Sequence, residues 1–108
     1  MVNVAGGRGG QRGNRPNDNC RPDRLMADAG ALAPRSRRVP TLWIYTANDT
    51  FFAPAIARGM HAAYTAAGGE AELRILPPWG NDGHDMFYGP GGSDSWGPIV
   101  QAFLTAHP

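Results

Sequence analysis

The stretch Thr41-Leu-Trp-Ile-Tyr-Thr46 decides the fold of this chain of 108 residues. It is rich in β-branched and aromatic residues and almost continuously apolar, which is typical of a strand buried on both faces of a parallel sheet. Asn48-Asp49-Thr50 ends the strand with turn-forming residues. Pro54 then opens an amphipathic helix, whose apolar side chains recur at helical spacing: Ile56, Met60, Ala63, Tyr64 and Ala67.

A second strand follows this helix and completes a parallel unit. Gly68-Gly69 ends the helix, residues 70–76 alternate polar and apolar side chains, and Pro77-Pro78 ends that strand. A strand, a helix and a strand in this order predict two parallel strands joined by a right-handed crossover. We therefore expect an α/β fold.

The residues before Thr41 predict one further strand and one further helix. Residues 2–5 are expected to form a short strand, which ends at segment 6–21 because that segment is too rich in glycine for a helix. A helix is predicted from Pro22 to about Leu32. Residues 34–38 are expected to be a linker.

The C-terminal part predicts a long loop and a last helix. Glycine recurs through residues 77–92, and Ser93, Asp94 and Ser95 are candidate caps for a helix with Pro98 in its first turn. The apolar face of that helix comprises Trp96, Ile99, Val100, Phe103 and Leu104. Residues 1–108 thus predict one unit of about three parallel strands with flanking helices.

The composition excludes several classes of protein. With 42% hydrophobic and 18% charged residues, this is not a highly charged disordered chain, although it has 15 glycines and 10 prolines. Residues 1–38 carry a net charge of +5 and residues 39–108 one of −4, so no basic field for nucleic acid or anionic lipid covers the whole chain. The longest apolar run, residues 42–45, is far shorter than the ~20 residues of a membrane span.

No side chain has the local pattern of an activated nucleophile. Cys20 is the only cysteine, so the chain can form no internal disulfide and no CxxC pair, and its compartment cannot be inferred from cysteine usage. The neighbours of Cys20 lack the glycine elbow of strand–turn–helix nucleophiles, and a buried or inert thiol is favoured. Ser93 and Ser95 lack that elbow too, so capping is their favoured role.

Two predicted loops carry ionisable side chains where ligands of open parallel sheets bind, at the carboxyl ends of strands. Asp49 lies in the first loop, and Asp82, His84 and Asp85 lie in the second. If the two strands are neighbours, Asp49 and His84 can approach each other. A carboxylate beside an imidazole fixes the tautomer of the ring and stabilises the imidazolium when the ring takes a proton.

Simpler interpretations of both loops remain open at this point. Asp49 could be only a turn former or a helix cap, and the Asp-Gly-His segment could be an ordinary solvated loop. Asp82, His84 and Asp85 could bind a divalent metal, but no HExxH motif or second nearby histidine supports a metal site. His61 and His107 are expected to be surface groups without a role.

The segment Gly6–Gly10, with Arg12 and Arg15 after it, suggests a further alternative. Arg/Gly-rich arms can bind single-stranded nucleic acid through charge and stacking. This run is short and has no interleaved aromatic residue. A glycine-rich loop at the end of a strand is therefore favoured.

The segments around Asp49 and His84 resemble dienelactone hydrolase-like α/β-hydrolases. Residues 39–54, Val-Pro-Thr-Leu-Trp-Ile-Tyr-Thr-Ala-Asn-Asp-Thr-Phe-Phe-Ala-Pro, are similar to the acid-bearing strand and loop of that family. Ala66-Ala-Gly-Gly69 and Leu76-Pro-Pro-Trp-Gly-Asn-Asp-Gly-His84 resemble its helix end, last strand and histidine loop, and residues 2–10 resemble the strand and loop before them. The resemblance covers nearly the whole chain.

This resemblance implies that Asp49 is the acid and His84 the base of a nucleophile–acid–histidine triad that hydrolyses small esters or lactones without a metal or cofactor. The family carries its serine or cysteine nucleophile on an earlier elbow, which this sequence lacks together with the first strands and most of the oxyanion hole. We therefore expect the C-terminal part, about 40%, of a hydrolase domain of typical size, with little catalysis of its own and with the N-terminal part as its partner. The alternative is a non-catalytic binding or structural domain on the same scaffold.

Overall fold

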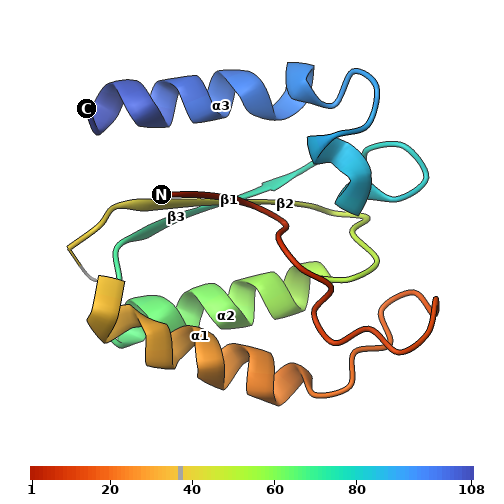
Figure 1. Cartoon of the computed structure of the whole chain (residues 1–108), viewed down its shortest axis with the longest axis horizontal. Coiled ribbons are helices and arrows are strands. Elements are labelled where there is room, and N and C mark those ends of the chain that lie inside the picture. Colours follow the sequence, from red (N-terminus) through yellow and green to blue (C-terminus); the bar gives the residue numbers. More distant parts are fainter. Residues whose placement is uncertain (37) are drawn as a thin grey trace.

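The sheet of this protein is built around β2 (Thr41–Thr46), as seen in a computed structural model that describes residues 1–36 and 38–108. β2 pairs in parallel with β1 (Val2–Val4) on one side and with β3 (Ala71–Leu76) on the other. Five of the six residues of β2 are buried. Because the strands are parallel, the segments that follow each of them lie at one end of the molecule (Figure 1).

Helices cover both faces of the sheet (Figure 1). α1 (Pro22–Ser36) and α2 (Pro54–Ala66) cover one face, and α3 (Ser93–Ala106) covers the other. Alternate side chains of β2 serve the two cores, since Tyr45 packs on the side of α1 and α2 whereas Leu42 and Ile44 pack on the side of α3. The continuous apolar pattern of this strand thus reflects burial on both faces, as predicted.

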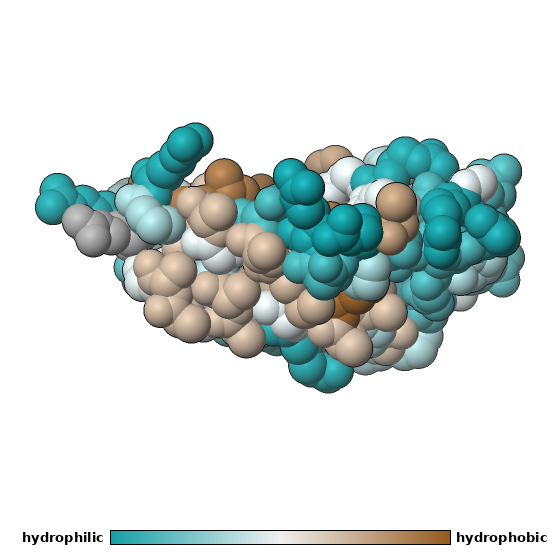
Figure 2. Space-filling view, turned by 90° about the horizontal axis from the view of Figure 1, so that it is seen from below, coloured by the Kyte–Doolittle hydropathy of each residue, from teal (hydrophilic) through white to brown (hydrophobic). Residues whose placement is uncertain are grey.

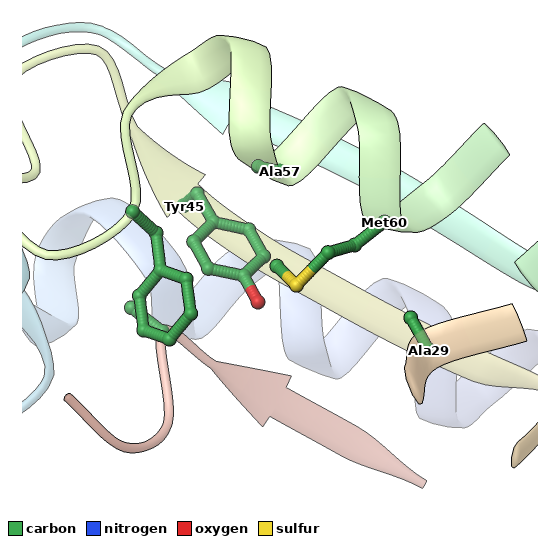
Figure 3. Close-up of a cluster of buried hydrophobic side chains, with 6 residues drawn as sticks. Ala29, Tyr45, Ala57 and Met60 are labelled. Carbon is green, nitrogen blue, oxygen red and sulfur yellow. The ribbon is translucent and has the colours of Figure 1, made fainter. Parts of the chain in front are cut away.

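The Tyr45 side chain lies at the centre of the core between β2 and the helices (Figure 3). Its ring lies near the Met60 side chain of α2, and Ala57 and Ala29 complete the contact from α2 and α1. Burial raises the pKa of the Tyr45 phenol to about 12; a weak hydrogen bond from Asn3 opposes this shift and the negative charge of Asp49 adds to it. The phenol therefore stays protonated in this core.

Small residues allow α1 and α2 to pack closely. A Cβ atom added at Gly30 of α1 would lie 3.4 Å from the Cβ of Ala63 in α2. The outer surface of the two helices also carries small side chains, and Figure 2 shows it as a weakly hydrophobic area bordered by hydrophilic groups. The exposed alanines of this surface include Ala27, Ala31, Ala55, Ala62 and Ala66.

Within the described residues, no helix has the length and hydropathy needed to cross a membrane.

The three parallel strands and three α-helices confirm the predicted α/β class, whereas the correspondence to the C-terminal part of a hydrolase fold stays a prediction. The prediction of a linker over residues 34–38 is wrong in its first half, because α1 continues to Ser36. Tertiary contacts stabilise this last turn: Ala33 is fully buried, and the Ser36 hydroxyl lies 2.6 Å from that of Tyr64. Arg37 of the predicted linker lies outside the described residues.

The start of α3 also differs from the prediction. The helix begins at Ser93 with Gly92 as its N-cap and without a side-chain cap hydrogen bond, so the predicted capping by Ser93, Asp94 and Ser95 is wrong. Gly92 already has helical backbone angles (φ −62°, ψ −35°), because a turn closed by its N–H and the Gly89 carbonyl leads directly into the helix. Pro98 consequently lies in the second turn. The predicted loop 77–92 also contains a short 3-10 helix, η1 (Gly83–Phe87).

Truncation of Leu42 should destabilise the fold far more than truncation of Leu32. Leu42 is fully buried in β2, whereas Leu32 on α1 is 56% exposed. We expect Leu42→Ala to lower the free energy of unfolding by roughly 2–5 kcal/mol and Leu32→Ala by less than about 0.5 kcal/mol. Urea unfolding followed by circular dichroism measures both, and equal midpoints would contradict the placement of β2 at the centre of the sheet.

Candidate active site

Asp49, directly after β2, uses its two carboxylate oxygens for different purposes. Oδ1 accepts hydrogen bonds from the backbone N–H groups of Phe51 (2.7 Å) and Phe52 (2.8 Å). Oδ2 lies 3.2 Å from Nδ1 of His84. The residue is only 2% exposed, and a carboxylate buried to this degree requires such donors. The turn-forming role and the histidine-facing role are thus both present in one side chain.

His84 lies in η1, after β3, with its ring held between Asp49 and two aromatic rings. The ring centroid lies 4.1 Å from that of Phe51 and 6.1 Å from that of Phe52. The side chain is 11% exposed. When Asp49 accepts the Nδ1 proton, the lone pair is on Nε2, which makes no hydrogen bond with any residue that the structure describes. The free nitrogen is the one that can take a proton from a reacting group.

Hydrogen bonds join the loop after β2 to the loop after β3 close to His84. The Asn48 side chain accepts from the N–H of Trp79 (2.9 Å) and donates to the carbonyls of Trp79 (3.1 Å) and Gly80 (3.2 Å). The N–H of Gly83 donates to the Asn48 carbonyl (3.3 Å). A Cβ atom at Gly83 would collide with the Thr46 hydroxyl and with the Asn48 side chain. Only glycine permits this close approach of the two loops.

The glycine-rich segment after β1 holds the Asp49 turn from the other side. The N–H of Asn17 (2.7 Å) and the Gln11 side chain (2.8 Å) donate to the Thr50 carbonyl, and the Asn19 side chain donates to the Phe51 carbonyl (2.7 Å). This segment is therefore folded onto the domain.

The arginines of this segment are engaged within the chain. Arg12 and Arg15 form ion pairs with Asp18 at 2.6 Å and 2.9 Å, and the Arg8 guanidinium lies over the Phe51 ring, 5.2 Å from its centroid. Exposed pairs of this kind contribute little to stability. Their contacts give the segment a structural role in this protein.

An open groove of about 880 Å³ lies between His84 and the outer edge of β1. Its walls are rich in aromatic side chains, and Phe87 stacks on Trp96 with ring centroids 5.0 Å apart. Among the described residues that line the groove there is no serine, threonine or cysteine. Cys20, predicted to be a buried or inert thiol, is exposed and does not line the groove.

Asp82 connects the two loops through its carboxylate. Oδ1 accepts from the N–H of His84 (3.0 Å) and from that of Thr50 (3.2 Å), and Oδ2 accepts from the Thr50 hydroxyl (2.5 Å). Partial burial alone would raise the pKa of Asp82, but the three hydrogen bonds together outweigh it, and the pKa is lowered. The ionised form is therefore the one that the fold stabilises.

The approach of Asp49 to His84, predicted from the order of the strands, is confirmed, whereas the catalytic role of the pair stays a prediction. In the described part of the chain, no three histidine, cysteine, aspartate or glutamate residues gather where they could hold a metal ion. His61, expected at the surface, is half-buried instead, with Nε2 2.9 Å from the Ala71 carbonyl. The bridge between Thr50 and Asp82 was not predicted, since no sequence motif marks a contact across 32 residues.

Comparison of the chain with protein-family models, with curated proteins and with solved structures gives no match. The resemblance to dienelactone hydrolases therefore rests on the quoted sequence segments alone.

Substitution of Gly83 should disrupt the contact between the two loops. We expect Gly83→Ala to lower the free energy of unfolding by about 1–3 kcal/mol, because its methyl group would occupy the space of the Thr46 hydroxyl. Gly97→Ala in α3 is the matched control, since a Cβ atom there meets no neighbour within 4 Å. Urea denaturation compares the two variants, and a Gly83→Ala variant as stable as Gly97→Ala would contradict the close approach.

Acid should weaken the fold partly through Asp82. Because the pKa of Asp82 is lower in the folded than in the unfolded chain, its ionised form stabilises the fold above about pH 4, and this contribution is lost as the pH falls through the folded-state pKa. In Asp82→Asn, stability should therefore fall less between about pH 5 and pH 3. Urea unfolding at both pH values tests this, with Asp94→Asn at an exposed position as the control. The same pH dependence in Asp82→Asn and in the unmodified chain would be the contrary result.

Proposed function

We propose that Asp49 and His84 are the acid and the base of a nucleophile–acid–histidine triad for acyl transfer. One observation carries the proposal: the Nδ1 atom of His84 lies 3.2 Å from a buried Asp49 oxygen, while the ring lines an open groove. A carboxylate in this position selects the tautomer with a basic Nε2 atom and stabilises the imidazolium. The aromatic walls of the groove suit a small ester or lactone.

In this scheme His84 moves protons and Asp49 orients it. Nε2 takes the proton of the attacking hydroxyl or thiol while the nucleophile bonds to the acyl carbon. The resulting imidazolium, stabilised by Asp49, gives that proton to the leaving group as the ester bond breaks. In the second half, Nε2 takes a proton from water as the water oxygen bonds to the acyl carbon. The imidazolium then returns this proton to the oxygen or sulfur of the nucleophile as its bond to the acyl carbon breaks, which releases the acid and restores the neutral ring.

The nucleophile of the proposed triad belongs to a segment other than those described. This part of the proposal is supported by a groove that lacks a serine, threonine or cysteine, and by the outer edge of β1, which pairs with no described strand. A further strand on that edge would bring its own carboxyl-terminal loop next to the groove. Such an arrangement agrees with the resemblance to dienelactone hydrolases, in which this chain corresponds to the C-terminal part of the fold.

An added nucleophile should reveal the base function of His84. With p-nitrophenyl acetate and a small thiol, we expect the chain to accelerate thiol acylation, and His84→Ala and Asp49→Asn to lose roughly 10²-fold of that rate. Product analysis by chromatography separates the thioester from acetate. His61→Ala is the control, because that ring contacts β3 far from the groove.

Two outcomes would count against the proposal. Equal thiol acylation by the unmodified chain and both variants would indicate a non-catalytic binding or structural domain. A burst of nitrophenol without thiol, with a covalent acyl group on a serine or on Cys20, would place the nucleophile within this chain.

A further inference from the structure

We propose that Asp82 is a positioning residue, which fixes the tautomer and the placement of the His84 ring by tying the His84 loop to Thr50. Asp82 makes no hydrogen bond with the imidazole; it acts through the backbone of His84 and through the segment that carries Asp49. The inference rests on the proposed function only in so far as the ring serves as a base. The geometry of the bridge stands independently of that function.

The bridge joins the two loops at the residues next to the Asp49–His84 contact. Thr50 follows Asp49 directly, and both its N–H and its hydroxyl donate to Asp82, at 3.2 Å and 2.5 Å. On the other side, the same carboxylate accepts the N–H of His84 at 3.0 Å. One side chain thus links the backbone at Thr50 directly to the backbone at His84, beside the bonds that Asn48 makes between the same loops.

The bridge between Asp82 and Thr50 should be sensitive to the loss of a single hydrogen-bond donor, because hydrogen bonds stabilise the Asp82 charge. Asp82 is half-buried, and no arginine forms an ion pair with it among the residues that the structure describes. Its charge therefore depends on the hydrogen bonds from Thr50 and His84. Without the Thr50 hydroxyl, one carboxylate oxygen has no donor from the described residues, and the loops lose their shortest connection.

A cap of η1 is the simpler role that Asp82 could have. Asp82 is the N-cap of this 3-10 helix and accepts from the N–H of His84, as caps commonly do. Capping requires only that local bond, whereas the two bonds from Thr50 span 32 residues. The two roles predict different consequences for a change at Thr50, which takes no part in capping.

Variants at Thr50 and Asp82 separate these roles. Thr50→Val removes the hydroxyl at nearly constant volume, Thr50→Ser keeps it, and Asp82→Ala removes the acceptor. Thr105→Val on the exposed surface of α3 is the matched control for the loss of a threonine hydroxyl. The primary measurement is nitrogen-15 NMR of the His84 ring at about pH 8, where an ordinary imidazole is neutral, since the ring shifts report which nitrogen carries the proton.

We expect one dominant Nδ1–H tautomer in the unmodified chain, in Thr50→Ser and in Thr105→Val, and a mixture of tautomers in Thr50→Val and Asp82→Ala. His84-dependent acylation of an added thiol should fall about 10- to 100-fold in the last two variants and return in Thr50→Ser. Thermal unfolding confirms that each variant is folded. If Asp82→Ala does not fold, Thr50→Val decides the question.

The outcomes distinguish this inference from the proposed function. The positioning role would be overturned if Thr50→Val kept a single Nδ1–H tautomer. It would also be overturned if Thr50→Ser, which keeps the hydroxyl, showed a mixture of tautomers. Asp49→Asn is the separate test of the acid–base pair: an unchanged tautomer and unchanged acyl transfer in that variant would overturn the proposed function. If Asp49→Asn alters both while Thr50→Val behaves as the unmodified chain, only the positioning role fails.

Discussion

The buried charge of Asp49 is the constraint on which the rest of this structure depends. A carboxylate that is 2% exposed must find its donors inside the protein, since water cannot supply them. Two donors are the N–H groups of Phe51 and Phe52, and they shape the turn that leads into α2. The remaining partner is the His84 ring, which arrives from the connection after β3. Satisfying one charge therefore sets both the entry of the crossover helix and the position of η1.

Local sequence patterns were sufficient to predict the strands, the crossover helix and the meeting of Asp49 with His84. The apolar run of β2 predicted burial on both faces, and the order of strand, helix and strand predicted that Asp49 and His84 would meet at one edge. The end of α1 escaped prediction because the burial of Ala33 and the Ser36–Tyr64 contact override the local effect of Pro34. The start of α3 escaped it because a glycine turn replaces the side-chain cap.

The polar contacts between the loops could not be predicted from the sequence. Asn48, Thr50 and Asp82 are ordinary turn residues in the sequence. Only their positions at neighbouring strand ends bring Asn48 to Trp79 and Thr50 to Asp82. Likewise, the groove combines residues from β1 with aromatic side chains from η1 and α3. Such a surface is a property of the folded chain, and no single segment carries its signature. The Asp49–His84 pair, in contrast, could be predicted, because the two residues follow adjacent parallel strands whose order is apparent in the sequence.

Because the strands are parallel, we expect the two ends of the sheet to differ in how well they tolerate an inserted residue. An inserted residue within β2 would shift its pairing and turn Tyr45 from the side of α1 and α2 to that of α3. The same insertion would displace Asp49. Before the amino-terminal end of β3, Gly68 lies in a left-handed turn (φ 94°), and a Cβ atom added there would meet no neighbour within 4 Å. We therefore expect an inserted residue to be tolerated in that turn, and to be disruptive in the strands and in the loops that join them to the groove.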